Sequence, residues 1–283
     1  MQPLPRIPGY VLCRRLGGGP MTAVYEARDA ESGAACAVKV VRDDWEDQAT
    51  AAKLLQREAR AGLMIRHPHL VRFTHAHVLQ TPHFLVMELL PGESLRRRLE
   101  REYRLPLAEA VWVVRQAAEA VAALHQAGFL HGDIKPDNVR LIGDGTAVLT
   151  DLGFAHRPGE NAAFLRAGYV LGTANYLAPE LCDELPTEDF SSDLFSLGVT
   201  LFEMLTGQLP YPPGSLRQTF RRHRCDPPAD VRRLAGPLPP GLAQLIERLL
   251  AHRPEDRPRA ASVVQQLVKV EIATLRQGFR RAG

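Results

Sequence analysis

The chain has 283 residues, and 45% of them are hydrophobic, which is enough for one large domain or two lobes and excludes disorder as the global state. Its 35 basic and 32 acidic residues leave a net charge of +3, which is too balanced to indicate a nucleic-acid partner. The four cysteines are widely spaced and no apolar run of about 18 residues exists, so we expect a cytoplasmic protein without disulfides or a membrane-spanning segment.

Short apolar runs separated by turn residues fill the first 90 residues, and they predict strands. The expected strands are residues 10–16, 23–29, 35–41, 70–79 and 83–88. A helix rich in Ala, Leu, Lys, Gln and Glu is expected over residues 46–66 and ends before His67-Pro68. The sequence therefore predicts a small β-rich unit with one main helix.

Beyond Pro91-Gly92 the pattern becomes mainly helical. The expected helices are residues 94–102, 107–127, 190–207, 240–251 and 260–279. We interpret the dense arginine run at 217–224, which lies in a Pro-rich region, as a solvated surface. The predicted fold class is α+β with two lobes, residues 1–90 forming the small lobe and residues 91–283 the large one. Ligand sites often lie between such units.

Residues 131–138 read HGDIKPDN and residues 151–153 read DLG, and together they contain the groups that phosphoryl transfer from ATP requires. One carboxylate is needed at the attacking hydroxyl, and a lysine can neutralise phosphate charge. A second carboxylate and an amide oxygen can hold magnesium, because hard cations prefer oxygen ligands. For the octet alone, an ordinary turn between two strands stays an alternative.

Three consecutive glycines, residues 17–19, lie in the turn between the first two expected strands. Glycine lets backbone N–H groups approach phosphate oxygens closely, so this turn is a candidate phosphate loop. A dinucleotide-binding loop is excluded because a strand, and not a helix, follows the glycines. A Walker A loop is excluded because Gly-Lys-Ser/Thr is absent.

These motifs, in this order, resemble the catalytic domain of the eukaryotic-like (Hanks-type) bacterial serine/threonine protein kinases. Residues 172–180 (GTANYLAPE), residues 193–198 (DLFSLG) and Arg257 in PEDRP extend the likeness, which spans about residues 10–265. The resemblance implies the bilobal kinase fold and a transferase that moves the γ-phosphate of ATP to Ser or Thr of a protein substrate. Its implied cofactors are ATP and Mg²⁺, with Mn²⁺ as a second candidate cation.

The resemblance also implies roles for individual residues. Asp133 would orient the substrate hydroxyl and accept its proton, and Lys135 would contact the γ-phosphate. Lys39, in the third expected strand, would hold the α- and β-phosphates, and Glu58 in the following helix would hold Lys39. The implied metal ligands are Asn138 and Asp151.

An adenine pocket is implied by the same resemblance. Met87 would guard the back of this pocket, and backbone groups of Glu88 and Leu90 would form hydrogen bonds with adenine. The remaining residues implied to contact the nucleotide are Leu16, Gly17, Gly19, Val24 and Ala37.

Two departures from the family concern activation. Gly132 replaces the arginine that usually precedes the catalytic aspartate and binds a phosphate on the activation loop. Between residues 154 and 177 the only Ser or Thr is Thr173, which we interpret as structural. We therefore predict activity without loop phosphorylation, in a loop held by its own packing. The residues expected to supply this packing are Phe164, Leu165 and Tyr169.

Other departures leave two alternative functions open. Arg140 occupies a usually apolar position below adenine. Its aliphatic stem could form the floor under adenine, or its charge could weaken ATP binding. Thr22 replaces the third glycine of the loop. Both would suit a pseudokinase that uses the fold to bind partners. Gly132 in the HGD sequence would suit a small-molecule phosphotransferase. Homodimerisation, which similar bacterial kinases show, also stays open.

Overall fold

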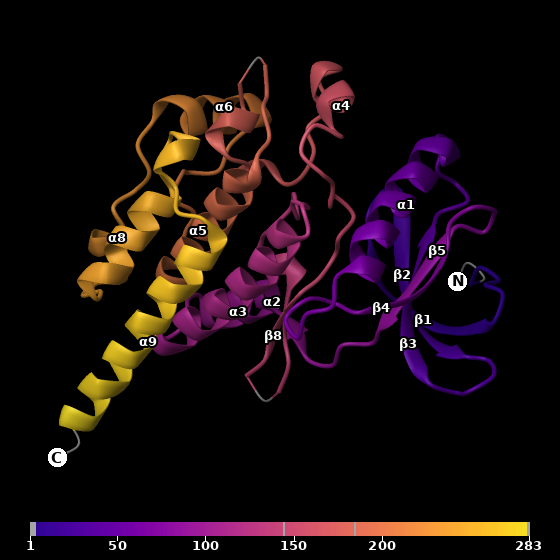
Figure 1. Ribbon diagram of the computed structural model, residues 1–283, viewed down its shortest axis with the longest axis horizontal. Helices are drawn as coiled ribbons and strands as arrows, with labels where there is room; N and C mark the ends of the chain where they lie inside the picture. Colours follow the sequence, from indigo (N-terminus) through magenta and orange to yellow (C-terminus); the bar gives the residue numbers. More distant parts are fainter. Residues whose placement is uncertain (1–3, 144, 184, 282–283) are drawn as a thin grey trace.

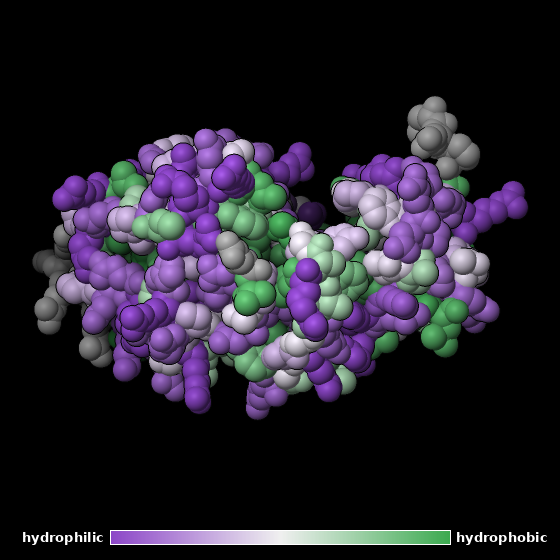
Figure 2. Space-filling view, turned by 90° about the horizontal axis from the view of Figure 1, so that it is seen from above, coloured by the Kyte–Doolittle hydropathy of each residue, from purple (hydrophilic) through white to green (hydrophobic). Residues whose placement is uncertain are grey.

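The computed structural model describes residues 4–143, 145–183 and 185–281, with side chains up to residue 274. The chain forms a small lobe built on a sheet and a larger helical lobe (Figure 1). The space-filling view shows the surface hollowed between the two lobes (Figure 2). This arrangement confirms the predicted α+β bilobal fold.

The small lobe contains a five-stranded antiparallel sheet with the strand order β1-β2-β3-β5-β4. Its single long helix, α1 (Gln48–Met64), begins where the Asp47 side chain accepts a hydrogen bond from the N–H of Thr50 at 3.0 Å. The helix approaches the sheet closely at Gly62, where a Cβ atom would lie 2.6 Å from the Phe73 ring. The strands are β1 (Tyr10–Gly18), β2 (Thr22–Asp29), β3 (Ala35–Val41), β4 (Phe73–His77) and β5 (Phe84–Glu88).

All five strands and the helix of the small lobe were predicted, with small differences in their ends. β1 runs two residues further than expected because Gly17 and Gly18 continue the pairing, opposite Val24 and Ala23 of β2. The strand expected over 70–79 is shorter, since only Phe73–His77 pairs with β5 as a strand.

The large lobe is built around α3 (Leu107–Gln126) and α5 (Phe190–Thr206), which contact each other and carry much of its buried core. A small sheet with the order β6-β7-β8 lies near the junction with the small lobe. Its strands are β6 (Glu93–Ser94), β7 (Val139–Leu141) and β8 (Ala147–Leu149). The other helices are α2 (Leu95–Glu102), α4 (Ala162–Arg166), α6 (Leu216–Cys225), α7 (Val231–Ala235), α8 (Pro240–Leu249) and α9 (Ala260–Arg281).

The arginine run at 217–224 forms helix α6, which was not predicted. A capping box starts this helix: Ser215 accepts a hydrogen bond from the Gln218 N–H, and the Gln218 side chain accepts one from the Ser215 N–H. Three of its arginines, Arg217, Arg221 and Arg224, are exposed, so the solvated surface is confirmed although the helix was missed.

Two further predictions concern the whole chain. All four cysteines are free, as the wide spacing predicted. None of the helices that the structure describes is long and apolar enough to cross a membrane. A cytoplasmic location stays a prediction.

Candidate active site

A buried carboxylate on α5 holds the loop that carries the HGD sequence. Asp193, 2% exposed, accepts hydrogen bonds from the backbone N–H groups of His131 at 2.8 Å and Gly132 at 3.0 Å. Its third partner is the His125 ring nitrogen Nε2 at 2.9 Å. Burial opposes ionisation of Asp193, but these partners outweigh it and lower its pKa. The ionised carboxylate therefore holds the loop backbone at a defined position.

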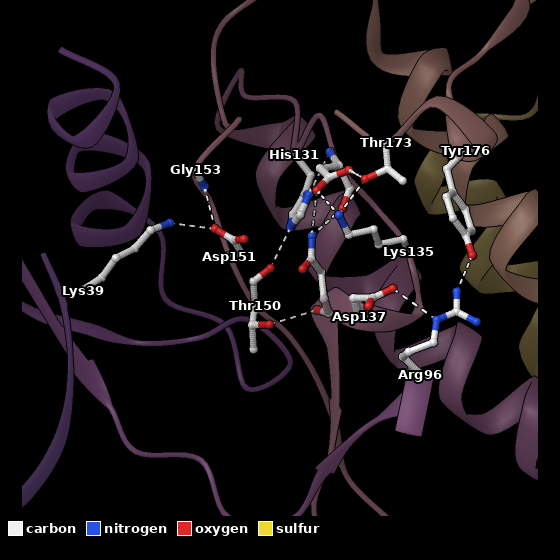
Figure 3. A network of polar contacts seen from close by, with 12 residues as sticks. Lys39, Arg96, His131, Lys135, Asp137, Thr150, Asp151, Gly153, Thr173 and Tyr176 are labelled. Atoms are coloured by element: carbon white, nitrogen blue, oxygen red, sulfur yellow. Dashed lines mark hydrogen bonds and ion pairs between the residues drawn. The ribbon is translucent and has the colours of Figure 1, made fainter. Parts of the chain in front are cut away.

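Asp133 lies at the centre of a compact polar cluster. Its Oδ2 atom accepts hydrogen bonds from Lys135 Nζ at 2.7 Å and from the Asn138 amide nitrogen at 3.1 Å, and its Oδ1 atom accepts one from Thr173 Oγ1 at 2.7 Å. Lys135 Nζ also donates to Thr173 Oγ1 at 2.6 Å (Figure 3). Two neighbours from the same loop and Thr173, which is 40 positions away, thus bind one carboxylate. Asp133 is only 5% exposed.

The second cluster joins the two lobes through an ion triad. Lys39 Nζ lies 2.8 Å from Glu58 Oε2. It also lies 2.7 Å from Asp151 Oδ1, and Figure 3 shows this second contact. Burial disfavours the charged form of Lys39, but the two carboxylates outweigh it and raise its pKa, while Lys39 lowers the pKa of Asp151 to about 2. Burial raises the pKa of Glu58, and Lys39 offsets only part of that effect. The predicted pairing of Lys39 with Glu58 is confirmed.

The DLG glycine has a steric role that the sequence did not reveal. Asp151 adopts a left-handed backbone conformation, with φ of 60°, which aspartate tolerates better than most residues. At Gly153 a Cβ atom would lie 3.0 Å from both Asp151 Oδ1 and Lys39 Nζ, and 3.6 Å from Glu58 Oε2. Glycine therefore leaves room for the ion triad to close.

Asn138 and Asp151 have the donor chemistry that magnesium prefers. Both hydrogen bonds of the Asn138 side chain use its amide nitrogen, which leaves its oxygen as the potential ligand. The Asp151 carboxylate, 45% exposed, is open to solvent on one side. The backbone N–H of Thr150 donates to the Asn138 carbonyl at 2.8 Å, which holds the two segments side by side. Mg²⁺ bound by one or two such groups usually completes its shell with phosphate oxygens and water.

The glycine turn between β1 and β2 is closed by its own backbone. The N–H of Gly19 donates to the Thr22 carbonyl at 2.9 Å. Gly18 has φ of 132°, and a Cβ atom there would lie 2.4 Å from the same carbonyl, so this glycine is the one that the turn requires. A Cβ atom on Gly17 or Gly19 would meet nothing within 4 Å, which leaves open space above the turn.

The expected adenine-binding residues lie on adjacent strands. Ala37 of β3 pairs with Met87 of β5, and Val24 of β2 pairs with Lys39. Glu88 is partly engaged elsewhere, since its backbone N–H donates to the Arg72 carbonyl at 3.0 Å. For Glu88, only the backbone carbonyl therefore stays a predicted hydrogen-bonding group for adenine.

Two other predicted nucleotide contacts, Leu16 and Leu90, differ in exposure. Leu16 is 41% exposed, whereas Leu90 is half-buried and packs against the main core. Nothing in the structure tests their contact with adenine, so both stay predictions.

Arg140 is held by the backbone that follows β5. Its Nη2 atom donates to the Gly92 carbonyl at 2.7 Å. Burial lowers its pKa, and Arg97 adds to this effect. The guanidinium group is therefore held by this hydrogen bond, and the aliphatic part of the Arg140 side chain is the part that can contact a nucleotide.

A polar network beside the Asp133 cluster was not predicted. Arg96 of α2 forms an ion pair with Asp137 at 3.2 Å and donates to the Tyr176 hydroxyl (Figure 3). It also forms an ion pair with Glu203 of α5 at 2.7 Å. Each residue comes from a different part of the large lobe, so no local sequence pattern could have identified the network. The resemblance to kinases also implies that Arg257 pairs with Glu180, and the structure shows this pair with two hydrogen bonds, at 2.7 and 2.8 Å.

Comparisons with known proteins agree with this geometry. Residues 10–268 match the family model described as protein kinase domain, and the chain belongs to that family. It is 34% identical over 251 residues to the serine/threonine-protein kinase PknD of Mycobacterium tuberculosis, which covers 88% of this chain and 37% of PknD. It is 32% identical over 279 residues to PknA of the same organism, covering 96% of this chain and 62% of PknA.

A third relative is the probable serine/threonine-protein kinase pknA2 of Bifidobacterium longum, 31% identical over 265 residues, which cover 91% of this chain and 35% of that protein. The chain thus spans between 35% and 62% of the length of these three curated relatives.

Proposed function

We propose that this chain is a serine/threonine protein kinase that transfers the γ-phosphate of ATP to hydroxyl groups of protein substrates. The observation that carries this proposal is the Asp133 cluster, in which Lys135, Asn138 and Thr173 all bind one carboxylate. A hydroxyl that approached Asp133 would meet an acceptor for its proton beside a lysine that can neutralise phosphate charge. Positioning and charge neutralisation are the main contributions that a protein makes to phosphoryl transfer.

We further propose that residues 1–90 bind the nucleotide while residues 91–283 supply the catalytic loop and the protein-binding surface. Lys39, held by Glu58, would neutralise the α- and β-phosphates. Asn138 and Asp151 would hold Mg²⁺, which would neutralise charge on the γ-phosphate that is transferred and on the phosphates that remain in ADP. The choice of Mg²⁺ over Mn²⁺, homodimerisation and the lack of a nucleic-acid partner stay predictions.

The two alternative functions are less well supported. A pseudokinase would be expected to have lost a charged catalytic group, whereas the ion triad and the Asp133 cluster are complete. Thr22 takes part in the closed glycine turn through its backbone carbonyl, which is independent of its side chain. The case for a small-molecule phosphotransferase rests on Gly132 alone and leaves Thr173 beside Lys135 without an explanation.

We also propose that activity does not require phosphorylation of the segment between residues 154 and 177. Gly132 has φ of 79°, and a Cβ atom there would lie 2.8 Å from the Phe154 carbonyl, which disfavours any phosphate-binding side chain at this position. The one serine or threonine hydroxyl of the segment, on Thr173, is already bonded to Asp133 and Lys135. Exhaustive phosphatase treatment is therefore expected to leave activity unchanged, and a large loss would contradict the proposal.

The expected packing of this segment is only partly present. The Phe164 and Tyr169 rings meet edge to face at 5.8 Å, and Arg57 lies over Phe164 at 5.7 Å. However, no residue of α4, as the structure describes it, is buried, and Tyr169 is 62% exposed. Contacts beyond packing must therefore hold the segment.

The decisive experiment is incubation of the chain with labelled ATP, Mg²⁺ and a generic protein acceptor, followed by analysis for acid-stable phosphoserine and phosphothreonine. Asp133→Ala is expected to abolish label transfer. Asp44→Asn, which alters an exposed carboxylate paired only with Arg42, is the matched control and should retain activity. Nucleotide binding without transfer by the unmodified chain would favour the pseudokinase, and transfer only to an aminoglycoside would favour the small-molecule enzyme.

A further inference from the structure

Two arginines of α1 reach from the small lobe to the segment that follows DLG. Arg60 Nη2 lies 2.6 and 2.7 Å from the two carboxylate oxygens of Glu160. Arg57 donates to the Glu160 backbone carbonyl at 3.2 Å and to Asn161 Oδ1 at 3.1 Å. Residues three positions apart lie on the same face of a helix, so both arginines contact one short stretch of the segment.

The same stretch is anchored to the large lobe by buried polar groups. Asn161, 4% exposed, donates from Nδ2 to Glu188 Oε1 at 3.2 Å, and Glu188 Oε2 lies 2.9 Å from His156 Nε2. The other ring nitrogen of His156 lies 2.7 Å from the Phe154 carbonyl. Because both ring nitrogens face acceptors, the doubly protonated ring fits this site best.

His156 in turn is joined to the catalytic loop. Its backbone forms a bridge with Leu130, with hydrogen bonds of 2.8 and 3.3 Å, and Leu130 directly precedes His131. A continuous series of polar contacts therefore runs from α1 through residues 160–161 to the start of the catalytic loop. At the other end, Glu58, which is next to Arg57 in α1, binds Lys39.

From this continuity we propose that Glu160 is a built-in anionic anchor that positions α1 for catalysis. Arg60 binds the Glu160 carboxylate and Arg57 binds the Glu160 backbone carbonyl, which keeps Glu58 within reach of Lys39 without any covalent modification of the segment. The inference rests on the proposed kinase function. Glu160 acts through α1 and does not contact the reacting atoms, so it is a positioning residue.

Several features of the contact favour this role over a chance surface ion pair. Exposed pairs usually contribute little because water screens them and both side chains are mobile. Here Arg60 and Glu160 are 40% and 26% exposed, and the Arg157 backbone N–H binds Glu160 Oε2 at 3.0 Å, which fixes the carboxylate. Burial opposes ionisation of Glu160, but Arg60 and the Arg157 N–H outweigh it and lower its pKa.

Charge reversal tests the proposal. Arg60→Glu and Glu160→Arg each place like charges together and are expected to reduce kcat/KM for ATP about 10-fold, a coupling of the size seen between linked sites. The double variant restores an opposite pair and is expected to recover most of the loss. Arg66→Glu makes the same charge change just beyond α1, at an exposed arginine that forms no ion pair with any residue that the structure describes, and should leave kcat/KM unchanged.

A second measurement separates this inference from the proposed function. Hydrogen exchange of the full chain reports the mobility of α1 and of residues 155–166 whether or not phosphate transfer occurs. Each single reversal is expected to speed exchange in both segments, and the double variant to slow it again. If the single reversals alter neither exchange nor kcat/KM, or if the double variant recovers neither, the anchor is refuted. An inactive unmodified chain with the expected exchange pattern would refute only the kinase proposal.

Discussion

The carboxylate of Asp193 offers a sharp test of how the catalytic loop is held. In Asp193→Asn the shape of the side chain is kept, but one of the two acceptor oxygens becomes an NH₂ group. In either orientation this NH₂ faces a backbone N–H, because Oδ2 accepts from His131 and Oδ1 accepts from Gly132. The variant therefore loses the charge and leaves at least one buried N–H without a partner.

The size of the effect follows from these contacts. Hydrogen bonds to a charged group contribute about 1.5–3 kcal/mol, and an unsatisfied buried donor costs about 1–3 kcal/mol, so a loss of about 2.5–6 kcal/mol is expected. An unfolding entropy of about 2.1 cal/mol/K per residue over 283 residues is about 0.6 kcal/mol/K, which converts the loss to a fall in Tm of about 4–10 °C. A displacement of the loop by about 1 Å would lower kcat about 100-fold.

Differential scanning fluorimetry and steady-state kinetics measure the two effects side by side. The matched control is Asp137→Asn, which changes an aspartate of the same loop whose side chain is 49% exposed and pairs with Arg96 alone. It is expected to lower Tm by about 1 °C or less, as for other exposed pairs. If Asp193→Asn kept its Tm within 1 °C and its kcat within about twofold, the inferred anchoring of the loop by Asp193 would be wrong.

Three further outcomes are expected. Gly153→Ala places a methyl group 3.0 Å from Lys39 Nζ and should raise KM for ATP about 10-fold with little change in Tm, measured by initial rates at varied ATP. Arg257→Lys loses the two-point contact with Glu180 and should lower Tm by about 2–5 °C in thermal unfolding, corresponding to about 1–3 kcal/mol; an unchanged Tm would contradict this. Glu188 raises the pKa of His156 against the opposing effect of burial, so this pair should stabilise the fold fully below about pH 6.5 and lose its effect as pH rises through the raised pKa. Scans of Tm between pH 6 and 9 should show this loss in the unmodified chain, and a His156→Gln variant with the same pH slope would count against it.

The secondary structure was largely predictable because its signals are local. The five strands and α1 follow from apolar alternation, turn residues and a helix-rich composition, and these signals need no knowledge of the rest of the chain. Helix α6 was missed because its flanks are rich in proline and its interior in arginine. The pair Ser215 and Gln218, at capping-box spacing, was the signal that could have found it. The short helices α4 and α7 have five residues each, too few for a clear period.

The candidate site was predictable only in part, because its contacts join residues that lie far apart in the sequence. Similarity to kinases indicated Lys39, Glu58 and Asp151, but the distances that join them depend on how the two lobes meet. The steric need for Gly153 became visible only once these three side chains had been placed. The contact of Arg60 with Glu160 joins residues 100 positions apart, and in the sequence both look like ordinary surface charges.

The single serine or threonine between residues 154 and 177 has a consequence for how such an enzyme would respond in a cell. Thr173 already bridges Lys135 and Asp133, so one copy would have no free serine or threonine acceptor in this segment through which to switch on another copy. Self-amplification through this segment, and the steep threshold that it produces, would then be absent. If the proposed function holds, output would rise in proportion to the amount of active kinase domain and the supply of substrate, and no phosphate on a serine or threonine of this segment would set its level.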